Sequence, residues 1–283
     1  MGVSSFLDRF RHPAPVVGVL SLSGVIGRLG PVGRGLSLAG LADAIEGAFK
    51  LRRLAAVALA VNSPGGSPVQ SQLIAKRIRD LADEKDVPVY AFAEDVAASG
   101  GYWLALAADE IYASENSIIG SIGVVSGGFG FTELIKRIGI ERRLHTSGDK
   151  KAMLDPFKPE KPADVKRLKD LQGDIHQSFQ SLVRERRGKR LKAREKELFS
   201  GAFWTGTRAL EMGLIDGIGD MRSVMRAKFG DRVKLKPVAR RQPFLRRRFG
   251  FSGPMGGSPV DGDWAAGAIA AIEERLIWNR FGL

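Results

Sequence analysis

An unbroken apolar run at residues 54–61 most constrains the fold, because such a run is buried on both sides only inside a helix-covered sheet. It ends in a glycine-rich turn at 62–66, and residues 71–84 then follow helical periodicity. A second strand at 87–93 precedes another small-residue turn, at 98–101, and a short apolar helix. This alternation predicts right-handed βαβ crossovers and an α/β fold.

Similar periodicity extends over most of the 283 residues. Further strands are expected at residues 16–22, 110–113 and 141–146, and further helices at 38–51, 132–139, 161–197 and 209–213. We divide the chain into an N-terminal arm (1–13), one folded domain (14–232), a basic flexible segment (233–263) and a C-terminal amphipathic helix (264–283). The division after residue 232 follows a change of composition to Pro, Gly and Arg.

The long expected helix at 161–197 carries an apolar stripe among many charges. The stripe consists of Leu168, Leu171, Ile175, Phe179 and Leu182. At helical spacing, such a stripe is expected to form core or a subunit contact rather than a cofactor site.

The net charge of +13 comes mainly from residues 184–196 and 232–248, and the second stretch contains no acidic residue. Arginines interleaved with phenylalanines suit an anionic membrane surface, and they also suit nucleic acid. A solvated basic tail is the plainer interpretation. We expect peripheral contact with an anionic membrane and no specific nucleic-acid recognition.

Several classes of chemistry and location are disfavoured by what the chain lacks. It has no cysteine, which excludes disulfides, thiol nucleophiles and cysteine metal sites. Its three histidines show no metal-binding spacing, so neither a metal nor a cofactor is expected. No stretch reaches the roughly 18–20 apolar residues of a membrane span, and the N-terminus lacks the order of a signal peptide. We expect a cytoplasmic protein held peripherally at the inner face of the membrane.

Two glycine-rich turns follow neighbouring expected strands at their carboxyl ends, where open α/β sheets build their sites. Ser99 opens the helix after one of them, beside backbone N–H groups that favour negative charge. It is a candidate nucleophile, and the N–H groups of Gly65, Gly66 and Gly100 are candidate oxyanion donors. The plainer interpretation makes Ser99 a helix N-cap and the glycines aids to close packing.

The residues by themselves leave the catalytic base open. His145 lies at the end of an expected strand and would complete a Ser-His-Asp triad. A lysine acts as a base only when neutral, so its ordinary pKa of about 10.4 must fall by several units through burial or nearby positive charge. Lys150 and Lys151 precede an apolar, proline-bearing segment, whereas most other lysines lie in charged helices. An exposed basic turn explains this pair equally well.

Five motifs carry a resemblance to a known family. They lie at residues 62–66, 98–102, 120–124, 147–151 and 204–216. In this order, over about residues 14–230, they resemble the signal peptide peptidase A (SppA/SohB-type) family of serine peptidases. That resemblance implies a ClpP/crotonase-like fold for residues 14–232. It also implies a Ser-Lys dyad with Ser99 as nucleophile, Lys151 as base, and oxyanion donors at Gly65, Gly66 and Gly100.

The resemblance further implies an endopeptidase that cleaves remnant signal peptides or other extended peptides with small or apolar side chains. The peptide would dock as an added strand, which makes Gly120, Ser121, Ile122 and Gly123 candidate substrate-binding residues. Short members of the family resemble half of the long, duplicated ones. We therefore expect a ring-like homo-oligomer in which Lys151 of one subunit reaches Ser99 of its neighbour.

Two features depart from the family pattern. Many relatives carry an N-terminal membrane anchor, and we expect none in this sequence; Lys150 stands where an aromatic residue or histidine is frequent. A second ammonium beside Lys151 would favour the neutral form of Lys151 if both were confined.

Two other functions remain as alternatives. A crotonase-type acyl-CoA enzyme would share the fold and the glycine turn, but needs an acidic catalytic group near Ser99. A non-catalytic basic protein that binds membranes or nucleic acid would show steep salt dependence and no peptidase activity.

Overall fold

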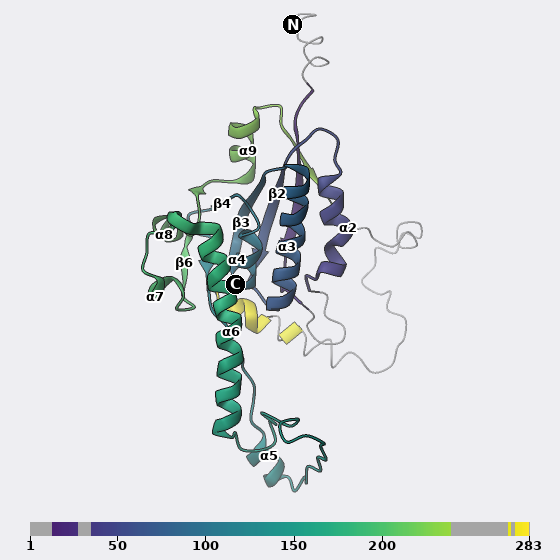
Figure 1. Cartoon of the computed structure of the whole chain (residues 1–283), viewed down its shortest axis with the longest axis vertical. Coiled ribbons are helices and arrows are strands. Elements are labelled where there is room, and N and C mark those ends of the chain that lie inside the picture. The colour runs from purple at the N-terminus through teal and green to yellow at the C-terminus, as the bar shows by residue number, and fades with distance from the viewer. Residues whose placement is uncertain (1–12, 28–34, 239–270, 273–274, 283) are drawn as a thin grey trace, which may run out of the picture.

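The computed structural model describes residues 13–27, 35–238, 271–272 and 275–282 (Figure 1). Within them, one sheet contains β1 (Val16–Ser23), β2 (Leu54–Ser63), β3 (Val89–Ala98), β4 (Glu110–Ala113), β5 (Ile118–Gly120), β6 (Phe203–Thr205), β7 (Gly217–Ile218) and β8 (Lys234–Pro237). The strand order is β6-β5-β3-β2-β1-β8, with β4 paired to β3 and β7 to β4. Every pairing is parallel except that of β5 with β6, which confirms the predicted α/β fold.

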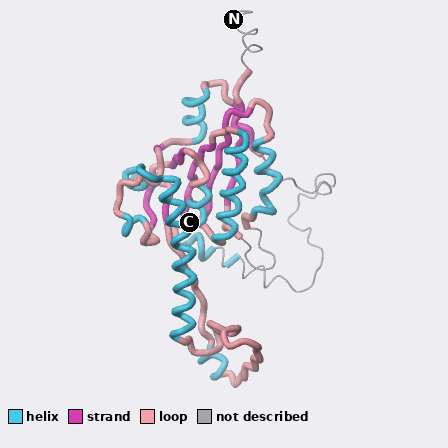
Figure 2. The backbone as a smooth tube through the Cα atoms, in the orientation of Figure 1, coloured by secondary structure: helices cyan, strands magenta, loops and turns pink. Residues whose placement is uncertain are grey.

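Helices cover both faces of this sheet (Figure 2). The named helices are α2 (Leu38–Phe49), α3 (Pro68–Lys85), α4 (Gly100–Ala105), α5 (Thr132–Arg137), α6 (Pro162–Arg187), the 3₁₀ helix η1 (Gly188–Arg190), α7 (Glu195–Leu198), α8 (Gly206–Met212) and α9 (Met221–Phe229), of which α5 lies away from the sheet. The first three and the last turns of α6 pack on one face, and α9 packs on the other. The described helices include none with the length and hydropathy that crossing a membrane requires.

Strand β2 lies in the middle of the sheet because both of its faces are apolar. Val57, Leu59 and Val61 belong to the large core beneath α2 and α3, whereas Ala56 and Ala58 face the smaller cluster under α9. Burying each of the three larger side chains contributes about 1.5–3 kcal/mol. The buried run at residues 54–61 therefore forms the central parallel strand that the sequence predicts.

The most unusual feature is a projection that we call the finger, residues 124–161, at the amino end of α6 and away from the sheet (Figure 1). It contains α5, none of whose residues is buried. Within it, the Phe131 N–H donates to the Pro156 carbonyl (2.6 Å), and Arg142 forms an ion pair with Asp155 (3.0 Å).

Two expected elements differ in the structure. The predicted strand at 141–146 is wrong, because these residues are irregular and exposed and no described strand lies beside them to complete a ladder. The helix expected over 161–197 ends at Arg187, because Gly188 leaves the helical conformation with a φ of +46°.

The sheet also continues beyond the predicted domain boundary at residue 232. Residues 234–237, expected in the basic flexible segment, form β8 and pair with β1. The expected C-terminal helix is helical at 271–272 and 275–279. The N-terminal arm up to residue 12 and the basic segment from 239 lie outside the described residues.

Candidate active site

Ser99 is the single residue between β3 and α4. Its backbone conformation is unusual, with φ 52° and ψ −121°. A non-glycine residue at positive φ costs on the order of 1–3 kcal/mol and persists only where its surroundings impose it. Here the Ser99 N–H donates to the Gly120 carbonyl (2.8 Å), and the Ser99 carbonyl accepts from the Trp103 N–H (3.0 Å). The half-buried Ser99 occupies the N-cap position of α4, but its side chain makes no capping hydrogen bond, so helix capping by the hydroxyl does not account for a serine here.

The glycine turn after β2 lies directly against Ser99. Gly65 has φ +105°, and a Cβ added to it would lie 2.8 Å from the Ser99 Cβ and 2.9 Å from the Gly100 nitrogen. Only a glycine allows this approach. The structure thus brings Gly65, Ser99 and Gly100 together, as the sequence predicts.

Two residues that the sequence analysis missed hold the glycine turn in place. The Ile26 N–H donates to the Gly65 carbonyl (2.8 Å), and the Ile26 carbonyl accepts from the Ser67 N–H (2.8 Å). Ser63 Oγ accepts from the Gly65 N–H (3.2 Å). The Gly65 N–H is therefore occupied within the turn itself. No local sequence signal marks Ile26, since its contacts are made across the fold.

The short helix behind Ser99 is held rigidly. All six residues of α4 are buried, and the Trp103 ring stacks on Phe179 of α6 at 4.7 Å between centroids. Burial raises the pKa of Tyr102 far above its ordinary value, so the phenol stays protonated and donates to the Leu214 carbonyl (2.7 Å). The first N–H groups of α4 have no acceptor within the helix.

The structure does not bring the candidate bases to Ser99 within one chain. Lys150, Lys151 and His145 are exposed on the finger. The finger joins the amino end of α6 at Pro162, whereas α4 packs against Phe179, seventeen residues further along that helix. At 1.5 Å per residue, the amino end of α6 is about 25 Å from Phe179, and Figure 1 shows the finger held beyond that end, away from the strand ends that carry Ser99.

The candidate substrate-binding strip continues from β5. Gly120 (φ +113°) and Ser121 (φ 52°) turn the chain, and the Ser121 N–H donates to the Ala202 carbonyl (2.7 Å). Ile122 is buried, and its carbonyl lies 3.2 Å from Nε2 of His176. Because β5 is already paired with β3 and β6, a peptide strand finds a free edge only beyond Gly120.

Comparison with known proteins decides the family. Residues 82–235, more than half of the chain, match the family model described as peptidase family S49. This chain belongs to peptidase family S49.

Named relatives of this S49 chain are longer proteins. The "Na(+)/H(+) antiporter NhaA" of Brucella abortus is 51% identical over 280 residues, which cover 97% of this chain and 38% of that relative. The "Serine protease SPPA, chloroplastic" of Arabidopsis thaliana is 32% identical over 210 residues, covering 74% of this chain and 31% of the relative. The chain therefore spans less than two fifths of the length of either protein.

A solved structure with the same fold is a mutant of the 1510-N membrane-bound stomatin-specific protease in complex with a substrate peptide. The two chains superpose with a TM-score of 0.51 at 14% identity, covering 83% of this chain and 96% of the other. At this identity the likeness concerns the fold alone, and it confirms the ClpP/crotonase-like fold.

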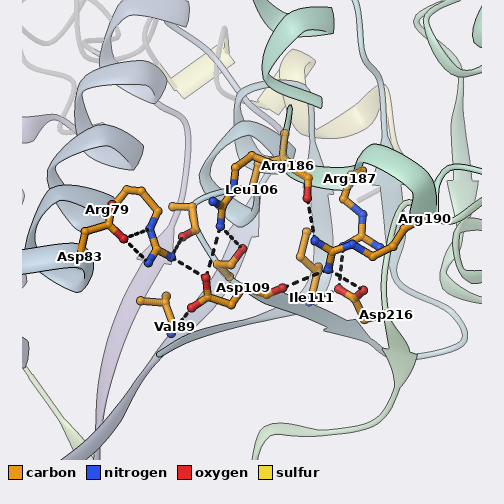
Figure 3. Close-up of polar contacts among 12 residues, drawn as sticks. Arg79, Asp83, Val89, Leu106, Asp109, Ile111, Arg186, Arg187, Arg190 and Asp216 are labelled. Carbon is orange, nitrogen blue, oxygen red and sulfur yellow. Dashed lines mark hydrogen bonds and ion pairs between the residues drawn. The ribbon is translucent and has the colours of Figure 1, made fainter. Parts of the chain in front are cut away.

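In this S49 chain, a network of arginines and aspartates fastens α6 to the body behind the site (Figure 3). Arg186 donates to the carbonyls of Leu106 and Ala108, both at 2.9 Å, and so fixes the carboxyl end of α4. Arg187, 2% exposed, donates to Asp216 at 2.6 Å. Arg186 and Arg187 are therefore anchors of α6, whereas Lys189, Lys192 and Lys196 of the same stretch are exposed as its composition indicates.

Burial by itself would raise the pKa of Asp216, but its hydrogen bonds outweigh that effect. They come from Arg187, the Ile111 N–H and Arg190. The pKa of Asp216 consequently lies below its usual range, and the carboxylate stays charged at neutral pH.

The second face of the sheet under Ser99 is covered by the C-terminal residues. Phe281, 7% exposed, clusters with Val96 and Ala98, the strand residues that lead into Ser99. Its ring also meets Phe203 of β6 edge-on at 5.0 Å. The amphipathic pattern of residues 264–283 predicts a C-terminal helix. It does not predict that Phe281, in the turn after the helical residues, supports the strands of the candidate site.

Proposed function

We propose that this protein is a serine endopeptidase in which Ser99 is the nucleophile and Lys151 of a second copy is the base. The observation that carries the proposal is the conformation of Ser99, whose uncapped hydroxyl stands at a strained turn against Gly65 and Gly100. A nucleophile beside unobstructed backbone N–H groups is the arrangement that acyl transfer needs. Membership of a peptidase family supports the same chemistry.

The steps follow from these groups. Neutral Lys151 accepts the Ser99 proton while Oγ attacks the peptide carbonyl, and the N–H groups of Gly66 and Gly100 hold the oxyanion. Lys151 then returns the proton to the leaving amine, which leaves an acyl-Ser99 ester. A water, deprotonated by Lys151, hydrolyses that ester and restores the serine.

The base comes from another copy because the finger holds Lys151 away from Ser99 of its own chain. Docking of the finger on a second copy would remove Lys151 from water and favour the neutral form that a base requires. We therefore propose a homo-oligomer whose sites are shared between subunits.

The substrate is an extended peptide that adds as a strand beside residues 121–124. Ser121, Ile122, Gly123 and Val124 are small or apolar residues, and we expect them to favour substrates with small or apolar side chains, such as remnant signal peptides. The aromatic and arginine residues at 240–249 support peripheral contact with an anionic, inner membrane surface. The Brucella relative is named as an antiporter, and this name also supports a location of the present protein near a membrane.

For the folded domain, we propose a boundary after β8 rather than at residue 232.

Hydrolysis of an extended, internally quenched peptide tests the proposal. We expect Ser99→Ala and Lys151→Ala each to lose at least about 10³-fold in kcat, because nucleophile and base act as a unit. Lys158→Ala, another exposed lysine on the finger, serves as the matched control and keeps its activity.

Activity that survives Ser99→Ala would overturn the mechanism. Loss with Lys150→Ala but not with Lys151→Ala would move the base by one residue. Hydrolysis of acyl-CoA but not of peptide would favour the crotonase-type alternative.

A further inference from the structure

Helix α6 contacts the proposed substrate strip, residues 121–124, through the side chain of His176. The Nε2 atom of this half-buried ring lies 3.2 Å from the carbonyl oxygen of Ile122, a fully buried residue of the strip. A carbonyl oxygen can only accept a hydrogen bond. We therefore assign the proton of the neutral ring to Nε2, which donates to Ile122. The catalytic steps described above give His176 no part.

The strip has few other supports. Strand β5 ends at Gly120, which is paired with both β3 and β6. Beyond it, the Ser121 N–H donates to the Ala202 carbonyl (2.7 Å). Within the described chain, this bond and the one from His176 are the hydrogen bonds that hold residues 121–124. The contact from α6 is therefore a large part of what fixes the strip.

Two residues further along α6 hold the ring of His176. Nε2 of Gln180 lies 3.4 Å from Nδ1 of the ring and 3.2 Å from its Nε2. Arg184 donates to Oε1 of Gln180 (3.1 Å), so the amide nitrogen of Gln180 faces the ring. Since the ring Nε2 is the donor to Ile122, Nδ1 remains as the acceptor for Gln180. The three side chains are spaced by four residues and form a row on one face of α6.

Arg184 fixes the outer end of this row. It donates two hydrogen bonds to the carboxylate of Glu195 on α7, both at 2.9 Å. Its guanidinium also lies over the Phe199 ring, 4.9 Å from the centroid. Hydrogen bonding to Arg184 holds the pKa of Glu195 below its usual range, so the carboxylate is charged at neutral pH. A continuous row of polar contacts thus links α7 to the carbonyl of Ile122.

We propose that His176 is a positioning residue for the peptide substrate. By holding the Ile122 carbonyl, it fixes the backbone of residues 121–124 in the conformation onto which the peptide strand adds. Strand addition needs backbone N–H and C=O groups at a fixed spacing and direction on the receiving edge. A strip that is free to turn must be ordered at each binding event, which weakens binding. This inference rests on the proposed function, because the strip matters in this way only if the protein binds a peptide.

The position of Ser99 does not depend on His176. The Ser99 N–H donates to the Gly120 carbonyl (2.8 Å), and Gly120 is held by its pairing with β3 and β6. Losing the bond from His176 therefore loosens the strip beyond Gly120 and leaves the nucleophile in place. The expected signature is a higher KM with a nearly unchanged kcat. A merely structural residue would instead lower the folded fraction, which reduces kcat and leaves KM unchanged.

Two amide variants of His176 form a matched test. In His176→Gln, the amide nitrogen is three bonds from Cβ, as Nε2 is in histidine, and it can donate to Ile122. In His176→Asn, the amide nitrogen is one bond closer to Cβ and does not reach. An internally quenched extended peptide with small and apolar side chains gives kcat and KM. The same peptide, labelled with the fluorophore alone, gives Kd by fluorescence anisotropy in a Ser99→Ala background.

We expect His176→Asn to raise KM about tenfold, because the buried Ile122 carbonyl loses its donor, with kcat within about twofold of the wild-type value. His176→Gln should bring KM back to within about threefold of wild type. In the Ser99→Ala background, Kd should follow the same order. Equal KM values for the three proteins would overturn the proposal. So would a loss of kcat alone, or a KM that is no lower with glutamine than with asparagine.

Nitrogen-15 NMR of histidine-labelled protein tests the hydrogen bonds without catalysis. The signals that disappear in His176→Asn belong to His176, and those of the neutral ring should show a proton on Nε2 and none on Nδ1. A proton on Nδ1 would overturn the proposal. Peptide binding in the predicted order of Kd, without hydrolysis by the protein that retains Ser99, would defeat the proposed function and leave the role of His176 intact. Hydrolysis with a KM that is insensitive to His176 would defeat the positioning role alone.

Discussion

The Arg187–Asp216 pair offers the clearest prediction of stability. Asp216→Asn keeps the size of the side chain but removes the charge that faces Arg187, which is 2% exposed. The guanidinium would keep its bond to the Gly213 carbonyl (2.9 Å), while one of its nitrogens is already buried without a hydrogen-bond partner among the described residues. The substitution therefore leaves a buried cation without its counter-ion.

Breaking a buried ion pair in this way costs about 3–5 kcal/mol. The bond from Arg190 is half-exposed and adds less than about 1 kcal/mol. Because Asp216 itself is partly solvated, we expect a loss near the lower end, about 3 kcal/mol in the free energy of unfolding. Urea unfolding followed by circular dichroism at fixed protein concentration measures it.

The control is Asp83→Asn, since Asp83 is an exposed partner of Arg79. It should cost less than about 1 kcal/mol. Equal losses for the two variants would refute the assignment of Asp216 as a buried anchor.

The contribution of Asp216 to the free energy of unfolding depends on pH with a definite sign. The folded-state pKa of Asp216 lies below its unfolded value, so its contribution is complete above the ordinary aspartate pKa of about 3.9. It is lost as the pH falls through the lowered folded-state pKa. The difference between wild type and Asp216→Asn should therefore be full at neutral pH and shrink in that acid range.

Three further predictions concern the site and its supports. Gly65→Ala should lower kcat at least about 100-fold, because Gly65 has a positive φ and an added Cβ would press on Ser99. Gly127→Ala, with open space around the added Cβ, should leave kcat unchanged. Phe281→Ala should cost about 3 kcal/mol, and hydrogen exchange should show faster opening at residues 96–98. Tyr102→Phe should cost about 1–2 kcal/mol in urea unfolding, because the buried Leu214 carbonyl loses its donor.

The sequence predicts what is encoded locally. The apolar run at 54–61 can be satisfied only inside a covered sheet, and the structure places it there. The turns at Gly65 and Ser99 were identifiable because their conformations select small residues and because both follow strands of one parallel sheet.

Features made by distant contacts could not be predicted in this way. A charge run looks like a solvated face, yet Arg186 and Arg187 bind carbonyls and a carboxylate from other elements. A strand was expected at 141–146, but a strand needs a partner, and the finger provides none within the described chain. The separation of Lys151 from Ser99 follows from the length of α6, which no local motif records.

The most direct test of the shared site mixes two inactive variants. The Ser99→Ala variant keeps Lys151, and the Lys151→Ala variant keeps Ser99. A site between copies is complete when a Lys151→Ala copy supplies the serine and a neighbouring Ser99→Ala copy supplies the lysine. After dissociation and reassembly of an equal mixture, random pairing predicts about one quarter of the wild-type activity. In the control, Lys151→Ala is replaced by the Ser99→Ala/Lys151→Ala double variant, and no activity should return. A reassembled mixture that stays inactive would contradict a site shared between Ser99 and Lys151.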